Sequence, residues 1–101
     1  MSVKIIIKRK FRKNSLQQVI PLLQKIRSKA NEQIGYVYGE TLLRNGYPHE
    51  VLIISSWNSI SDWNKWKVNP VRQEYENILL NLQSNPTEYK EYILGTSTLM
   101  S

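Results

Sequence analysis

The sequence predicts an α+β fold of the ferredoxin-like type, in which the order β-α-β-β-α-β forms a four-stranded antiparallel sheet with helices on one face. Three observations predict it. Segments with the two-residue period of strands and the 3.6-residue period of helices follow one another in that order. Two β-rich runs in the middle of the chain are joined by turn-forming residues. The length of 101 residues suits one hydrophobic core and leaves no room for a second.

The first third predicts a strand and a helix. Apolar residues alternate with polar ones over residues 3–11, and Arg9 is the one break in the apolar face. Ser15 is the expected cap of the helix, because Gln18 follows at capping-box spacing. An apolar stripe runs through residues 16–30, and Gly35 is the expected stop. Pro21 inside the stripe is expected to kink this helix or to delay its regular part.

The remainder predicts a hairpin, a helix in two parts and a last strand. Residues 36–43 and 50–57 are the hairpin strands, and residues 44–49 are the turn. Ser59 caps a short helix with Asp62 at the box position, and Asn69 caps a second helix that begins with Pro70. The last strand covers residues 87–94. We expect one domain over residues 1–95 and a C-terminal tail over residues 96–101.

The strands are apolar or aromatic on both faces, although helices cover only one. Alternation places Tyr36, Tyr38 and Leu42 on one face of their strand, and Val37 and Leu43 on the other. A second apolar face is not expected to stay wet. The sequence therefore predicts a homodimer in which a second copy covers the open sheet face and encloses a cavity.

The net charge of +6 is unevenly distributed. Residues 1–31 carry nine bases and no acid (+9), whereas residues 32–101 carry five bases and eight acids (−3). Such asymmetry raises nucleic acid or an anionic membrane as a partner. Because the bases are spread along a strand and the outer face of a helix, and no RNA-reader signature is present, we expect neither partner. With no signal peptide or spanning segment evident, we expect a cytoplasmic protein.

Three passages carry a family resemblance: VKIIIKRKF at residues 3–11, QIGYVYGETL at residues 33–42, and LIISSW at residues 52–57 followed by SISDWNKW at residues 59–66. Over nearly the whole chain the sequence resembles the antibiotic biosynthesis monooxygenase domain family. The resemblance implies a dimeric α+β barrel. That fold group contains cofactor-free monooxygenases acting on polycyclic phenols, heme degraders, and other enzymes.

The resemblance implies a cofactor-independent monooxygenase that acts on a small aromatic, phenolic or quinone-like compound, with no cofactor and no metal. It implies catalytic roles for Trp66, Arg72 and Asn69. It also implies substrate-binding roles that use the following residues: Trp63, Tyr75 and Asn64. A substrate that is deprotonated in a dry pocket supplies the electron to dioxygen itself, so the protein need only desolvate it and hydrogen-bond to the developing anion.

Other interpretations remain open. The domain is alternatively a non-catalytic small-ligand-binding or structural homodimer, because fold does not fix function. Heme degradation is disfavoured, because heme-degrading relatives use an Asn on the first strand and a His on the helix after the Trp segment. Here residues 3–11 contain no Asn, and the only histidine, His49, lies in the expected turn. The absence of cysteine excludes a disulfide scaffold, a zinc knuckle and a thiol nucleophile.

Individual side chains also have competing interpretations. The three tryptophans either fill the core or line a cavity, and Trp57 at a strand end is the core candidate. Arg9 and Glu40 each interrupt an apolar face, so each either pairs with a charge or lines a polar cavity. We expect pairing, because an isolated buried charge is costly. Arg27 is expected to reach an acid at the edge of the core.

Overall fold

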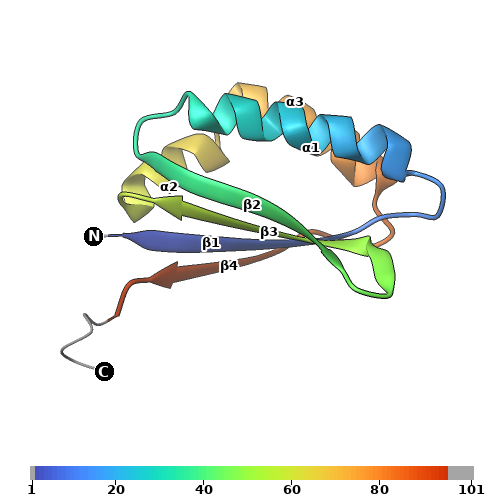
Figure 1. Ribbon diagram of the computed structural model, residues 1–101. Coiled ribbons are helices and arrows are strands. Elements are labelled where there is room, and N and C mark those ends of the chain that lie inside the picture. The colour runs from blue at the N-terminus through green and yellow to red at the C-terminus, as the bar shows by residue number, and fades with distance from the viewer. Residues whose placement is uncertain (1, 96–101) are drawn as a thin grey trace.

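A computed structural model of the chain describes residues 2–95 and shows, within them, three helices on one face of a four-stranded antiparallel sheet (Figure 1). The strand order is β2-β3-β1-β4. This is the ferredoxin-like arrangement predicted from the sequence, and the predicted tail at residues 96–101 lies outside the described residues. The elements are β1 (Val3–Lys10), α1 (Leu16–Asn31), β2 (Tyr36–Arg44), β3 (Tyr47–Trp57), α2 (Ile60–Lys67), α3 (Pro70–Leu82) and β4 (Glu88–Ile93).

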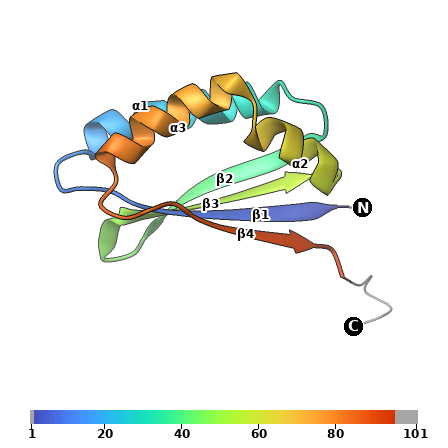
Figure 2. The same ribbon diagram turned by 180° about the vertical axis from the view of Figure 1, so that it is seen from behind.

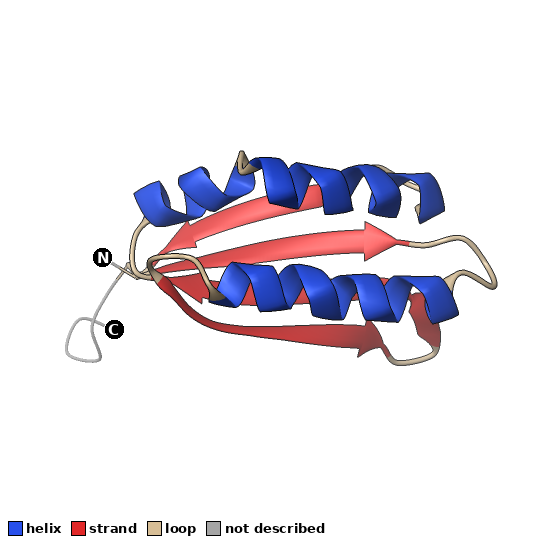
Figure 3. Cartoon of the chain, turned by 90° about the horizontal axis from the view of Figure 1, so that it is seen from above, coloured by secondary structure: helices blue, strands red, loops and turns tan. Residues whose placement is uncertain are grey.

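The core lies between the sheet and the helices. Figure 3 shows α1 and α3 lying side by side along the sheet, with α2 beyond the end of α3. Every second residue of β1 faces the helices, so Val3, Ile5 and Ile7 are buried while the residues between them are not. α1 contributes one apolar stripe to this layer, and its buried members are Val19, Leu23, Ile26 and Ala30.

Two of the three expected helix caps form as predicted. The Ser59 hydroxyl accepts a hydrogen bond from the Asp62 backbone N–H at 3.1 Å, and the Asn69 side chain accepts one from the Val71 N–H at 2.9 Å. The capping box at Ser15 was wrong. The Ser15 hydroxyl donates to the carbonyl of Arg12 instead and makes no cap bond to the helix.

α1 is not delayed by Pro21, which lies in the second turn of an uninterrupted helix. Pro21 is exposed, so water can reach the carbonyl one turn earlier that loses its N–H partner. The helix ends at Asn31, short of Gly35. Gly35 has a φ of 87° in the connection to β2, where a side chain would also collide with Asp62.

The hairpin strands are longer than predicted. They run to Arg44 and start again at Tyr47, which leaves a turn of two residues with Gly46 at a φ of 82°. A register shift also lies between Tyr36 and Tyr38, because Tyr36 pairs with Trp57 while Tyr38 pairs with the adjacent Ser56. The two tyrosines therefore lie on opposite faces of the sheet, contrary to the simple alternation expected from the sequence.

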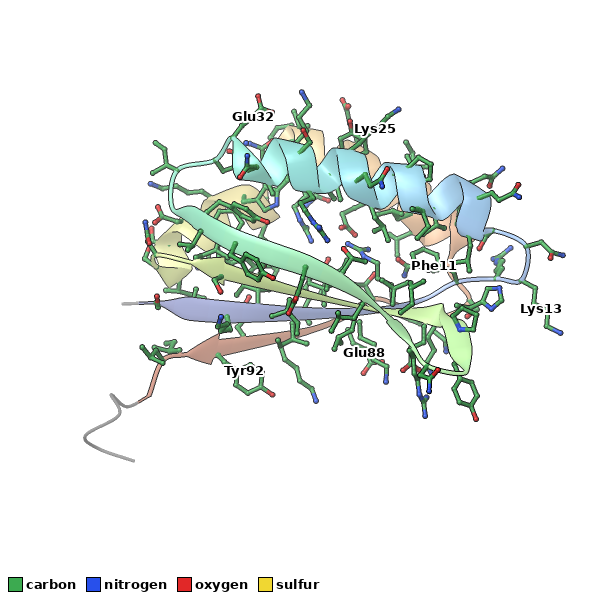
Figure 4. The ribbon with its side chains drawn as sticks, viewed as in Figure 1. Phe11, Lys13, Lys25, Glu32, Glu88 and Tyr92 are labelled. Atoms are coloured by element: carbon green, nitrogen blue, oxygen red, sulfur yellow. The ribbon has the colours of Figure 1, made fainter. Side chains whose placement is uncertain are left out.

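The other face of the sheet carries no helix within residues 2–95 (Figures 1 and 2). Glu88 and Tyr92 point away from the helices on this side, whereas Lys25 and Glu32 project from the outer side of α1 (Figure 4). The half-buried aliphatic residues of this open face lie at its centre, on β1 and β3: Ile6, Leu52 and Ile54. Glu40 on β2 accepts a hydrogen bond from the Tyr38 hydroxyl at 3.1 Å, and the ion pair expected from the sequence is not seen for it among the described residues.

The bases of the N-terminal third do not share one surface. Arg9 is buried in the helix-covered layer, and Lys8 and Lys10 lie near Glu50 at 3.9 and 3.8 Å on the open face. Lys25 lies on the outer side of α1 (Figure 4). Within residues 2–95 no helix is both long and apolar enough to cross a bilayer. The cytoplasmic location expected from the sequence stays a prediction.

Candidate functional site

A partly open cavity of about 50 Å³ lies in the layer between the sheet and the helices. Side chains from β1, β2 and β3 form its floor, and side chains from all three helices form its roof. The lining residues are Ile7, Arg9, Leu23, Ile26, Arg27, Ala30, Tyr36, Gly39, Thr41, Ile53, Ser55, Trp57, Trp63, Trp66 and Arg72. The lining includes three arginines and, among the described residues, no carboxylate and no histidine.

One end of the cavity is aromatic and contains the three tryptophans of the chain. Trp57 packs edge-on against Tyr36 with ring centroids 5.2 Å apart, and Trp63 lies 5.9 Å from Trp57. The indole N–H groups of these two tryptophans are already bound. Trp57 donates to the Ser55 hydroxyl at 3.2 Å, and Trp63 donates to Glu91 at 2.6 Å. These rings therefore offer faces and edges to the cavity rather than donors.

The other end is a buried charged cluster. Arg9 binds Glu76 through both terminal nitrogens, and its Nη1 lies 3.0 Å from Glu76 Oε2. The same nitrogen donates to Gln83 Oε1 at 3.1 Å. Arg72 lies 3.2 Å from Glu76 Oε1 and donates to the Tyr89 hydroxyl at 3.1 Å. The pairing expected for Arg9 is confirmed, and its partner comes from α3.

Arg72 joins the two ends of the cavity. Its guanidinium lies over the Trp63 ring, 5.2 Å from the centroid, and only 2% of the residue is exposed. A cation held against an indole face and out of water is a strong electrostatic element. The cavity is therefore lined by aromatic rings and carries a positive charge.

The mouth of the cavity lies between α1 and the edge strand β2. A wider groove of about 410 Å³ opens there, and three residues border both spaces: Arg27, Tyr36 and Gly39. The Tyr36 ring lies over Gly39, where a Cβ atom would collide with the phenol oxygen. Arg27 contacts the Thr41 hydroxyl, not the acid expected from the sequence.

This position also affects the pKa of the Tyr36 phenol. Burial raises the pKa of its phenol above the usual 10.0, while the charge of Arg27 acts in the opposite direction and Tyr38 adds a further increase. Tyr36 is therefore a neutral hydrogen-bonding group at the mouth near neutral pH.

The structure brings together three of the six site residues named from the sequence. Trp63, Trp66 and Arg72 line the cavity. Tyr75 is half-buried against the core, outside the cavity lining. Asn64 is exposed on α2, and Asn69 is engaged in capping α3. The roles proposed for all six residues stay predictions.

Sequence reasoning did not name Arg9, Arg27, Tyr36 or Thr41 as site residues, although all four line the cavity. Arg9 carried a signal, since a charge in an apolar strand face is either paired or at a cavity. Tyr36 carried none, because only the register shift turns it toward the helices. The part of the chain that the structure describes holds no cluster of acidic or histidine side chains suited to a metal.

No family sequence model matches the chain, and no curated protein matches it significantly. Solved structures do match. A structure described as an antibiotic biosynthesis monooxygenase superposes with a TM-score of 0.86 at 11% identity, over 93% of this chain and 99% of that one.

Two further structures are similar in the same way. Rv0793 from Mycobacterium tuberculosis gives a TM-score of 0.86 at 12% identity, over 97% of this chain and 99% of that chain. SnoaB, a cofactor-independent oxygenase from Streptomyces nogalater, gives 0.83 at 11% identity, over 96% of each chain. At this sequence identity a structural match shows the fold alone. This chain has the fold of the antibiotic biosynthesis monooxygenases.

Proposed function

We propose that the protein is a cofactor-independent monooxygenase acting on a small phenolic or quinone-like aromatic compound that enters this cavity from the groove beside β2. The observation that supports this most directly is the cavity lining. It combines the three tryptophans with three arginines and, among the described residues, no carboxylate. Such a lining stabilises an aromatic anion, which is the species that donates an electron to dioxygen without help from a metal or flavin.

The reaction balances without a further reductant. A substrate with an acidic CH₂ group next to an aromatic carbonyl loses a proton, transfers one electron to dioxygen, and combines with the superoxide so formed at that carbon. The peroxide then loses water and leaves a carbonyl. In total, CH₂ and O₂ become C=O and H₂O.

The arginines and the tryptophans of the lining have different roles in this reaction. Arg72 and Arg27 favour the ionised substrate, because nearby positive charge lowers the pKa of an acidic group. Trp63 and Trp66 line the inner cavity and exclude water from the ionised oxygen of the substrate. Because the described lining offers no carboxylate or histidine as a base, the substrate must ionise readily and give its proton to solvent.

The enclosed volume sets a condition on binding. A cavity of about 50 Å³ is smaller than the roughly 150 Å³ that holds a benzene ring. A ring therefore occupies the groove and the mouth, and Tyr36 and Arg27 must move aside for it to go deeper.

Dissolved-oxygen consumption tests the proposal. Metal-stripped protein is mixed with an anthrone, which carries the required CH₂ group, in the presence of a chelator, and we expect oxygen loss in proportion to enzyme and to carbonyl product. Trp66→Phe and Arg72→Lys are expected to lower kcat/KM at least about tenfold, since the first fills the cavity wall less completely and the second loses the planar guanidinium that lies over the Trp63 ring.

Lys25→Gln is the matched control, because it removes one exposed charge on the outer side of α1 and we expect unchanged kinetics (Figure 4). Circular dichroism of each variant establishes that it is folded. No oxygen consumption by the wild type, or equal rates in all three variants, contradicts the proposal. Quenching of tryptophan fluorescence by the same compounds without oxygen loss supports the ligand-binding alternative.

We also propose that the open sheet face is covered by a second copy of the chain. Its centre is aliphatic, as described above, and Tyr38 and Leu42 extend the patch onto β2 with 53% and 42% of their surface exposed. Around the patch, the basic Lys4 lies on the central strand β1 and the acidic Glu40 and Glu88 lie on the flanking strands. Both signs of charge on one face suit contact with a two-fold copy of the same face.

Light scattering at micromolar concentration tests this contact, with a mass of two chains expected. Ile54→Asp places a charge at the centre of the patch and is expected to give one chain, while Lys25→Gln is expected to keep two. A wild-type mass of one chain contradicts the proposed homodimer.

A further inference from the structure

The charged end of the cavity holds more positive than negative charge. Arg9, Arg72 and Glu76 are 1%, 2% and 5% exposed, so the two guanidinium groups share one carboxylate away from water. Burial pushes the pKa of Glu76 upward, but the hydrogen bonds and charge of Arg9 and the charge of Arg72 prevail and lower it. Glu76 is therefore ionised near neutral pH, and the cluster keeps a charge of about +1.

No other acid near the cavity balances this charge within the described residues. Glu76 stands behind the arginines and is absent from the lining, while Arg27 adds a third cation to it. Glu91, which is close to Trp63, also lies 3.4 Å from the ammonium of Lys67. An excess of buried positive charge is costly unless a negative charge is supplied.

Arg9 also has one donor without an acceptor. Its Nη1 donates to Glu76, Gln83 and Thr87, and its Nη2 contacts Glu76. Its Nε is buried and, among the described residues, has no hydrogen-bond partner. Buried donors are almost always satisfied, and an arginine N–H is a strong one. Arg9 is a lining residue of the cavity, so a group bound in the cavity is a candidate partner for this donor.

A small anion would both neutralise the excess positive charge and accept the hydrogen bond of Arg9 Nε, whereas a water molecule would do only the second. Water accepts the Nε–H bond but leaves the excess charge in place. The volume of about 50 Å³ holds one small anion or one oxygen substituent and excludes a ring. A ring whose ionised oxygen points inward would remain at the mouth, between Arg27 and Tyr36.

We propose that the inner cavity is an anion subsite, in which Arg9 Nε donates to the negatively charged oxygen of a phenolate or enolate, or to a free monovalent anion of similar size. The charge comes from Arg9 and Arg72 beyond what Glu76 neutralises. The inference rests on the proposed function in using the same cavity, and it adds the ionisation state of the ligand and the atom that binds it. Its test is a binding measurement that needs no turnover.

Tryptophan fluorescence reports on this subsite, because the three tryptophans of the chain all line the cavity. Wild-type protein is titrated with sodium iodide, a quenching monovalent anion, at constant ionic strength with gluconate, which is too large to enter. We expect quenching that saturates in the millimolar range. Acrylamide, a neutral quencher, is expected to quench without saturation. Iodide quenching that stays linear overturns the proposal.

A pair of ring compounds separates the two anion sources. Pentafluorophenol is ionised at neutral pH, whereas pentafluorobenzene has the same ring and no charge. If the anion is carried by the ring, the phenolate binds at least tenfold more tightly than the neutral ring and displaces iodide. If iodide saturates and the phenolate does not displace it, the subsite belongs to a free anion. Equal binding of the two rings without saturable iodide quenching overturns both forms.

Variants locate the site. Arg9→Lys keeps a cation for Glu76 but removes the Nε donor, so we expect iodide affinity to fall at least tenfold. Lys25→Gln, which removes an exposed cation, is expected to change it less than twofold. If Arg9→Lys does not fold, Arg27→Gln is measured instead, since Arg27 lies at the mouth outside the Glu76 cluster. We expect this variant to bind iodide about threefold more weakly than the wild type. Unchanged affinity in the folded variant overturns the proposal.

Failure here is separable from failure of the proposed function. Saturable anion binding without oxygen consumption keeps the subsite and contradicts the monooxygenase. Oxygen consumption with linear iodide quenching keeps the monooxygenase and contradicts the subsite.

Discussion

The two faces of this sheet are made from the same strands, yet they differ in what holds them in place. The helix-covered face buries Ile5, Trp57 and the Arg9–Glu76 pair, each with defined partners. The open face carries Ile6 and Ile54 half-buried, and salt contacts of 3.8 to 3.9 Å between lysines and Glu50. Alternation along a strand thus places a buried core and a half-buried open face one residue apart.

Removing one charge from each face gives the largest expected contrast. Glu76→Ala leaves Arg9 and Arg72 buried without their shared carboxylate, so we expect a loss of about 3–5 kcal/mol in the free energy of unfolding. Glu88→Ala on the open face is expected to change it little, because Glu88 is exposed. Urea denaturation at neutral pH measures both. Equal losses of unfolding free energy in the two variants would contradict the conclusion that the two faces differ in how tightly their charges are held.

Adjacent isoleucines on β1 test the same contrast without charge. Ile5→Ala empties a fully buried site and is expected to cost about 2–5 kcal/mol, whereas Ile6→Ala is expected to cost about 1 kcal/mol in dilute protein. If a second copy covers the open face, the cost of Ile6→Ala grows with protein concentration, because association stabilises the wild type more. Thermal unfolding at two concentrations a hundredfold apart measures this.

The pH dependence of stability sharpens the contrast further. The pKa of Glu76 in the folded protein is below 4.5, so the unfolded chain binds the proton more tightly. Its contribution to stability is present above the unfolded pKa and is lost as the pH falls below about 4.5 toward the lower folded value. Urea denaturation from neutral to acid pH is expected to show this decline in the wild type, and a flatter profile in Glu76→Gln. Parallel profiles would contradict the ionised cluster.

The smallest expected effect comes from the mouth. Gly39→Ala places a methyl group where the Tyr36 phenol now lies, and the ring can swing outward to make room. We expect a change in unfolding free energy of about 1 kcal/mol or less and a higher acrylamide quenching constant for the tryptophans. Leu43→Ala, on the same strand but outside the lining, is the control for quenching. Unchanged quenching in Gly39→Ala would show that Tyr36 does not close the mouth.

Much of the fold was predictable because it depends on local patterns. Alternation in β1 identified which residues face the core, and the Asn69-Pro70 pair identified the start of α3. The pairing of Arg9 was also predictable in kind, since a buried charge needs a partner. That the partner is Glu76 was not, because periodicity gives the face of a residue but not its neighbour 67 positions away.

The candidate site was less predictable, for two physical reasons. Asn69 was chosen as a catalytic candidate, but its carboxamide binds the backbone of α3, a role that the same Asn-Pro pattern already indicated. Asn64 neighbours Trp63 in sequence, but successive helical residues point in different directions and it lies in solvent. Spacing identified the helix that carries the site and left the orientation of each polar side chain open.

The extra residue at the register shift decides which side of the sheet Tyr36 faces. Substituting Val37, the residue between Tyr36 and Tyr38, changes one exposed side chain. In a regular strand of the same length, Tyr36 would share the open face with Tyr38 and its ring would turn away from Trp57. Deleting Val37 would leave the two tyrosines adjacent, so alternation would still keep the Tyr36 ring on the side of Trp57. The closure of the cavity beside β2 therefore depends on a backbone irregularity, and not on the side chain that forms it.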